Sequence, residues 1–147
     1  ERSIHNIDII LVEDSIEDAN LVMRSLPQNN LGNNIIHLKD GSEALDFIFA
    51  QGEFSERKVE DKPRLILLDL KMPKIDGLQV LRELKKDGRT KAIPVVIMTS
   101  SREDRDLIDS YELGVNSYVV KPVSFENFAQ AVAELGMYWL MVNQAPK

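Results

Sequence analysis

Short apolar runs alternate with amphipathic segments along this 147-residue chain, and this alternation constrains the fold more than any other feature. The runs are rich in Ile, Leu and Val, which is typical of strands buried on both faces of a sheet. They cover residues 7–12, 35–38, 65–68, 94–98 and 117–120. We therefore predict an α/β fold in a single domain over residues 1–147, with a parallel sheet of five strands and helices on both faces.

Helix patterns fill the intervals between these runs, with apolar residues spaced to form one buried face. We predict that the helices start at an N-cap Ser15, at Gly41 or Ser42, after Gly77, near Leu107 and at Ser124. The last helix is predicted to extend from about residue 124 to 143. Residues 51–62 are charged and irregular in pattern, and we predict a surface loop there.

Polar side chains follow four of the predicted strands, at the edge of the sheet where ligands bind in folds of this kind. They are Glu13 and Asp14 after the first strand, Asp69 after the third, Thr99 after the fourth and Lys121 after the fifth. One such acid alone is most often a solvated loop residue, so the prediction depends on the joint pattern. Three close carboxylates repel one another, and oxygen-only ligands suit Mg²⁺ or Mn²⁺. A carboxylate nucleophile beside an ammonium group and a hydroxyl then suits phosphoryl transfer.

Several short motifs carry a resemblance to a known family. They are Val-Glu-Asp at 12–14, Leu-Leu-Asp-Leu-Lys-Met-Pro at 67–73, Asp-Gly at 76–77, Thr-Ser at 99–100 and Lys-Pro at 121–122. Over about residues 8–136 the chain resembles the receiver domain of two-component response regulators, the CheY-like family. The resemblance implies a doubly wound, flavodoxin-like parallel sheet in the order 2-1-3-4-5. It also implies phosphoryl transfer from a histidine kinase or a histidine phosphotransfer protein.

The resemblance assigns roles to the acidic residues by position. Asp69 would be the phosphoacceptor. Asp14 and Asp69 would bind Mg²⁺ directly, together with the backbone carbonyl of Lys71, and Glu13 would bind it through a water molecule.

It also assigns roles to the other groups at the sheet edge. Lys121 would pair with the phosphoryl group, and Pro122 would follow it through a cis peptide bond. Thr99 would move inward to donate a hydrogen bond to the phosphoryl group, and Tyr118 would swing as Thr99 moves. Lys71 and Ser101 would border the approach of water, and neither is an acid or an amide. We therefore expect slow self-dephosphorylation.

Three other functions are weighed against this one. A haloacid-dehalogenase-like phosphatase needs a second Asp two residues after its nucleophile, where this chain has Lys71. Flavin binding of the flavodoxin type needs a phosphate loop after the first strand, where this chain has Glu13 and Asp14. A pseudo-receiver usually lacks the acceptor or the lysine, and both are present. We predict a signalling module that turns over no external substrate.

Charge and composition limit the partners and the compartment. The formal net charge is -6, which argues against nucleic acid as a partner. There is no cysteine, no apolar stretch of membrane-spanning length and no secretory leader pattern, so we expect a cytoplasmic protein away from membranes. His5 and His37 are interpreted as surface or hydrogen-bonded residues without a catalytic role.

The C-terminal region suggests a second copy as a partner. Apolar side chains continue after Gly136, at Met137, Tyr138, Leu140, Met141 and Val142. Because a surface helix rarely exposes so much apolar area, we predict a homodimer through this region. This extension, the 51–62 segment and the stretch from Thr99 to Asp104 resemble the phytochrome-associated response regulators.

Overall fold

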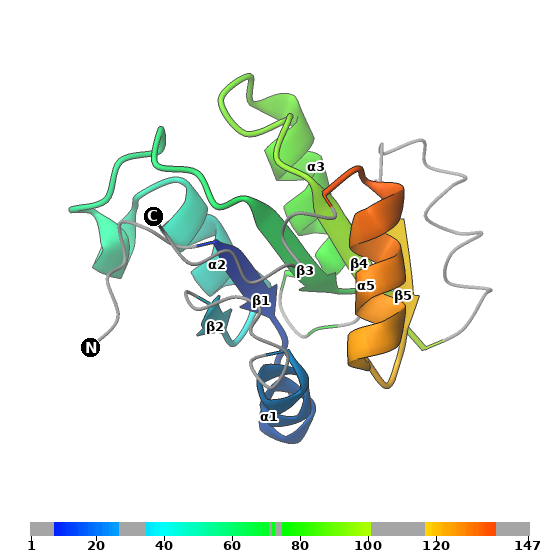
Figure 1. Cartoon of the computed structure of the whole chain (residues 1–147). Helices are drawn as coiled ribbons and strands as arrows, with labels where there is room; N and C mark the ends of the chain where they lie inside the picture. Colours follow the sequence, from blue (N-terminus) through cyan, green and yellow to red (C-terminus); the bar gives the residue numbers. More distant parts are fainter. Residues whose placement is uncertain (1–7, 27–34, 71, 73–74, 101–116, 138–147) are drawn as a thin grey trace, which may run out of the picture.

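The computed structural model describes residues 8–26, 35–70, 72, 75–100 and 117–137, and Figure 1 shows their arrangement. In chain order the elements are β1 (Ile9–Val12), α1 (Ile16–Ser25), β2 (Ile35–Leu38), α2 (Gly41–Ile48), the 3-10 helix η2 (Gly52–Phe54), β3 (Leu65–Asp69), α3 (Gly77–Lys86), β4 (Val95–Thr99), β5 (Ser117–Val120) and α5 (Phe125–Glu134). The helix predicted near Leu107 lies outside the described residues.

The five strands form one sheet in the order β2-β1-β3-β4-β5, and every neighbouring pair is parallel. This confirms the predicted fold and the strand order that the family resemblance implied. The strands are buried along their length except in the edge strands β2 and β5, which agrees with their near-continuous apolar sequences.

Alternating side chains of the strands supply two hydrophobic clusters, one on each face of the sheet. The first cluster packs against α1 and α5, through residues such as Val22 and Phe128. The second packs against α2 and α3, through residues such as Phe47 and Leu81. The sheet is therefore covered on both faces, by α1 and α5 on one and by α2 and α3 on the other (Figure 1).

Side-chain caps fix where the helices begin. Ser15 accepts a hydrogen bond from the N–H of Asp18 and caps α1, as predicted. Ser124 caps α5 and forms a reciprocal capping box with Asn127. α2 begins at Gly41, one of the two predicted starts, and its N-cap is Asp40, whose carboxylate accepts a hydrogen bond from the N–H of Glu43.

The last helix ends earlier than predicted. α5 ends at Glu134, with Leu135 as C-cap and Gly136 at a φ of 74°. The N–H groups of Gly136 and Met137 donate to the carbonyls of Ala133 and Val132, which is the bonding pattern of a Schellman motif. The prediction of one continuous helix from 124 to about 143 is therefore wrong at Gly136. Residues 138–147 lie outside the described residues.

The 51–62 segment is more ordered than the predicted surface loop. It contains η2, and Arg57 is buried within it. The Arg57 guanidinium lies 3.9 Å from the centre of the Phe47 ring and donates to the carbonyls of Phe47 and Asp61. Phe54 packs edge-on against Phe47, with ring centroids 5.0 Å apart. These contacts attach the segment to α2.

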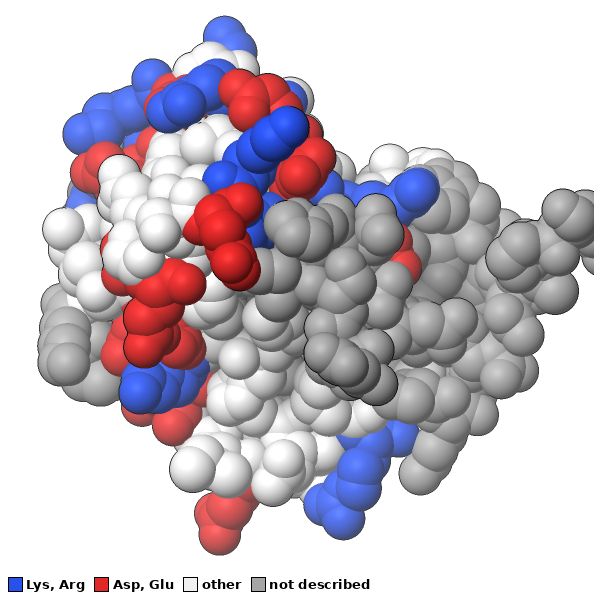
Figure 2. Space-filling model, turned by 90° about the vertical axis from the view of Figure 1, so that its left-hand side faces the viewer, with Lys and Arg blue, Asp and Glu red and all other residues white. Residues whose placement is uncertain are grey.

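Charged side chains mix on the side of the molecule that carries α2 and η2. Figure 2 shows Lys and Arg beside Asp and Glu on this face rather than in a separate basic patch. None of the helices in the described ranges is both long and apolar enough to cross a membrane.

Candidate functional site

The register of the strands brings the candidate residues to one edge. Val12 pairs with Leu68, Asp69 pairs with Met98, and Thr99 pairs with Val120. Each strand therefore ends at nearly the same level. The residues that follow β1, the last residues of β3 and β4 and the residue after β5 consequently meet at the C-terminal edge.

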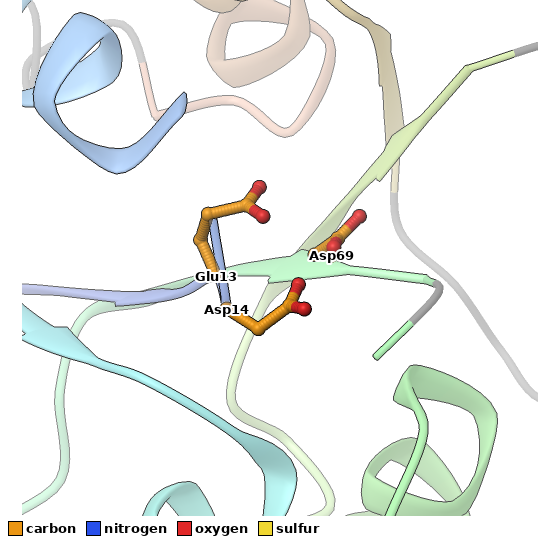
Figure 3. A group of neighbouring side chains, drawn as sticks. All are labelled: Glu13, Asp14 and Asp69. Carbon is orange, nitrogen blue, oxygen red and sulfur yellow. The ribbon is translucent and has the colours of Figure 1, made fainter. Parts of the chain in front are cut away.

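Three carboxylates form the centre of the site. One oxygen from each of Glu13, Asp14 and Asp69 lies within 4.8 Å of the other two. Figure 3 shows the three side chains directed toward a common region from the ends of β1 and β3. Glu13 and Asp69 are 1% and 5% exposed, whereas Asp14 is open to solvent. The site is thus a mostly buried acidic cluster with one side accessible.

Lys121 supplies the positive charge. Its Nζ lies 3.0 Å from Glu13 Oε1, 3.1 Å from Asp69 Oδ1 and 3.5 Å from Asp18 Oδ2. The backbone N–H of Lys121 donates to the carbonyl of Thr99 at 2.8 Å, which extends the pairing of β4 and β5 by one bond. The peptide bond to Pro122 is cis, as the family resemblance implied. One ammonium group therefore faces three carboxylates.

Burial and charge shift the protonation of these groups in different directions. Loss of water raises the pKa of Glu13 to about 7, against the opposing effects of Ser15 and Lys121. Burial also raises the pKa of Asp69, and contact with Lys121 offsets part of this increase. Burial alone would lower the pKa of Lys121, but the contacts with Glu13 and Asp69 together raise it. The lysine thus stays charged while the two buried acids hold protons more readily than usual.

The donor set fits a hard divalent cation. All three candidate side-chain ligands are carboxylates, which Mg²⁺ and Mn²⁺ prefer. Glu13 Oε1 is buried and makes a charge contact with Lys121, but it accepts no well-directed hydrogen bond. A buried oxygen without such a bond has unused capacity to accept one from a metal-bound water.

Glu13 is held by several backbone contacts. Its N–H donates to the carbonyl of Leu38 at 3.1 Å, and its Oε2 accepts from the N–H of Ser15 at 3.1 Å. The ring Nε2 of His37 lies 2.7 Å from its backbone carbonyl oxygen. The N–H, the carbonyl and the side chain of Glu13 are therefore all held, which fixes the segment between β1 and α1.

The proposed switch residues lie on neighbouring strands. Thr99 is buried at the end of β4. Tyr118 in β5 is half-buried, pairs with Ile97 and packs against the cluster on the α2 and α3 face. Their movement remains a prediction. Lys71 and Ser101 lie outside the described residues. The backbone ligand predicted at Lys71 and the predicted slow self-dephosphorylation therefore stay predictions.

Two contacts of the site were not predicted from the sequence. Asp18 reaches Lys121 from the first turn of α1, and His37 reaches the Glu13 carbonyl from β2. The spacing of Asp18 four residues after Asp14 was an available signal. The position of His37 depends on the pairing of Leu11 with His37, which the sequence pattern did not predict.

The sequence and the fold both match known proteins. The family model of the response regulator receiver domain matches residues 9–133, which are most of the chain. This chain belongs to that family. The probable methanogenesis regulatory protein FilR2 of Methanothrix harundinacea (strain 6Ac) is 42% identical over 138 residues, which are 94% of this chain and 86% of that protein. The response regulator Rcp1 of Synechocystis sp. is 41% identical over 132 residues, which are 90% of this chain and 88% of that protein.

Solved structures agree with this receiver fold. The bacteriophytochrome response regulator RtBRR matches with a TM-score of 0.87 and 46% identity, over 95% of this chain and 84% of that chain. Rcp1 in its Mn²⁺-bound form matches with a TM-score of 0.72 and 39% identity, over 96% of this chain and 99% of that chain. The receiver domain is therefore similar to phytochrome-associated regulators, as the sequence suggested.

Proposed function

We propose that this receiver accepts a phosphoryl group on Asp69 in a Mg²⁺-dependent reaction. The observation that carries the proposal is the position of Lys121, whose Nζ lies 3.1 Å from Asp69 Oδ1 beside the Glu13 and Asp14 carboxylates. This arrangement pairs a buried carboxylate nucleophile with a charge that is fixed in place. Mn²⁺ would suit the same ligands.

The chemistry follows from the charges in the site. An Asp69 oxygen attacks the phosphorus of a phosphohistidine, the P–N bond breaks, and the departing imidazole nitrogen takes up a proton. Lys121 and the hydroxyl of Thr99 then pair with phosphoryl oxygens. A bound Mg²⁺ would supply positive charge to the phosphoryl oxygens. Lys121 would exchange carboxylate partners for phosphoryl oxygens during the reaction, and Thr99 would move with Tyr118.

The phosphoryl donor would be a histidine kinase or a histidine phosphotransfer protein. Apolar side chains on α1, the helix that follows Glu13 and Asp14, support contact with a protein, because Ile16 is 70% and Leu21 is 49% exposed. A cavity of about 260 Å³ between Leu21 and Val123 opens next to Lys121. The similarity to RtBRR, a bacteriophytochrome response regulator, supports a phytochrome-type kinase as the donor.

The output would be a change of shape rather than turnover of an external substrate. We propose one receiver domain over residues 1–147, acting in the cytoplasm through protein contacts and without nucleic acid. We further propose a homodimer through the C-terminal region. Size-exclusion chromatography with light scattering should give twice the chain mass at high protein concentration. A single-chain mass, with and without phosphorylation, would contradict the dimer.

Phosphorylation is tested with acetyl phosphate, Mg²⁺ and intact-mass measurement. The wild-type chain should gain one phosphoryl group, and Asp69→Asn should gain none because the nucleophile is absent. Asp87→Asn is the matched control, since Asp87 lies at the end of α3 and pairs with Arg89 outside the site. Equal adducts on wild type and Asp69→Asn would overturn the proposed function.

A further inference from the structure

Because β2 ends at Leu38, the strand supplies no main-chain N–H to the backbone carbonyl of Glu13. In the parallel ladder, the N–H of Glu13 bonds to the Leu38 carbonyl at 3.1 Å. Continuation of the ladder would bring the N–H of Asp40 to the Glu13 carbonyl. However, β2 ends at Leu38, and Asp40 begins the turn into α2 as its N-cap. The main chain of the edge strand therefore turns away at this point.

The side chain of His37 occupies the place of the missing donor. Its Nε2 lies 2.7 Å from the Glu13 carbonyl oxygen. Because a carbonyl only accepts, Nε2 carries the hydrogen of this bond. His37 and Ile35 share one face of β2, and Ile35 belongs to the cluster beneath α1 and α5. The ring thus extends the ladder by one bond past the end of the strand.

We propose that His37 is a positioning residue for the cation site, an inference that rests on the proposed function. The carbonyl that it bonds belongs to the peptide unit joining Glu13 to Asp14. A change in ψ of Glu13 or in φ of Asp14 would break this bond by moving the carbonyl out of place, and would turn the two carboxylates relative to each other. The His37 bond holds the plane, so both carboxylates stay directed toward Asp69.

The other contacts of this segment do not restrain the same peptide unit. The Leu38 bond acts on the peptide before Glu13, and the Ser15 bond acts on the Glu13 side chain. Asp14 is exposed, so packing restrains its carboxylate less than burial restrains Glu13 and Asp69. Its position depends chiefly on the backbone that His37 fixes. Groups that orient metal ligands in this way commonly change metal affinity by about tenfold or more.

The test measures Mn²⁺ binding by electron paramagnetic resonance, which reports the free ion and needs no phosphorylation. His37→Leu removes the donor at similar size and should raise the dissociation constant about tenfold. His37→Gln keeps an N–H near the position of Nε2 and should bind within about twofold of wild type. Wild-type affinity in His37→Leu, or equal weakening in both variants, would overturn the proposal.

A matched control separates positioning from general loss of stability. Ile36→Ala lies in the same edge strand and packs on the opposite face, away from the Glu13 carbonyl. It should lower the free energy of unfolding in urea while leaving Mn²⁺ affinity at the wild-type value. If the affinities of Ile36→Ala and His37→Leu fall together with their stabilities, the positioning role is overturned.

The hydrogen bond itself has a spectroscopic signature. Long-range ¹H–¹⁵N correlation spectra should show the hydrogen of His37 on Nε2 in wild type, and a ring protonated only on Nδ1 would overturn the proposal. Absence of Mn²⁺ binding in wild type would overturn both this inference and the proposed cation site. Normal Mn²⁺ binding with weakening in His37→Leu, but no phosphorylation on Asp69, would support the inference and overturn only the proposed phosphoryl transfer.

Discussion

At the scale of single residues, the site is a cluster of charges that are incompletely neutralised. Lys121 faces Glu13, Asp18 and Asp69, so one positive charge serves three acids. Burial opposes ionisation of Glu13 and Asp69, and Lys121 offsets this only in part. Without a metal, the folded state should therefore be most stable when Glu13 or Asp69 is protonated.

This balance predicts how stability depends on pH in the metal-free protein. The pKa of Glu13 is about 7 in the folded chain and 4.5 ordinarily, so between these values the folded state binds more protons than the unfolded state. The free energy of unfolding should therefore fall as pH rises through this window. The raised pKa of Asp69 acts in the same direction.

Urea unfolding in the presence of a chelator checks this prediction. Glu13→Gln should flatten the pH dependence, because the amide does not titrate. Glu126→Gln, at an exposed glutamate of α5, should leave the slope as it is in wild type. A slope that Glu13→Gln leaves unchanged would show that the pH dependence does not come from this carboxylate.

The residues of the site differ in how far the sequence could predict them. Glu13, Asp14, Asp69, Thr99 and Lys121 were predicted to meet because each follows or ends a strand, and parallel strands end at one edge. Asp18 and His37 were not, since their contacts depend on how α1 approaches Lys121 and on the register of β2.

At the scale of elements, the strands were more predictable than the ends of helices. Apolar runs define a buried strand within a residue or two. A helix start depends instead on which of several neighbouring residues supplies the cap. The sequence left α2 to begin at Gly41 or Ser42, and the structure begins it at Gly41 with Asp40 as the cap. The end of α5 was missed because apolar residues continue past Gly136. Burial of Arg57 was not predicted because a segment rich in charged residues is usually exposed to solvent.

Two helix ends offer a matched test of backbone conformation. α2 and α5 both end in the Schellman bonding pattern, with Ala50 at a φ of 56° and Gly136 at 74° in the left-handed position. Alanine is disfavoured there because of its Cβ. Ala50→Gly should therefore raise the free energy of unfolding by about 0.5 kcal/mol, and Gly136→Ala should lower it by about 1 kcal/mol.

The open surroundings of Gly136 exclude a steric clash as a cause of the expected destabilisation. A Cβ at Gly136 would meet no atom within 4 Å, so its effect is confined to the backbone. Urea denaturation of the two variants measures both values. Changes of the same sign would contradict the assignment of a left-handed cap at one of the two helix ends.

At the scale of the whole molecule, the fold separates the tasks of packing and chemistry. The two hydrophobic clusters occupy the faces of the sheet, and the ionisable groups of the site gather at the edge where the strands end. This separation explains why an alternating pattern of apolar runs predicts the architecture, and why the residues just after those runs predict the site. The acidic cluster reduces stability locally, and the clusters on both faces offset that cost.

Cation binding should consequently stabilise the entire domain. A ligand that binds only the folded state adds free energy of unfolding, about 1.4 kcal/mol at a roughly tenfold excess over its dissociation constant. For a domain of this size, Mg²⁺ should then raise the melting temperature by about 4 °C. The stabilisation should shrink in Asp14→Asn, which loses one charge of the exposed ligand, and should persist in Asp76→Asn at the N-cap of α3. KCl at matched ionic strength controls for screening, and an equal rise with KCl would contradict a specific cation site at Glu13, Asp14 and Asp69.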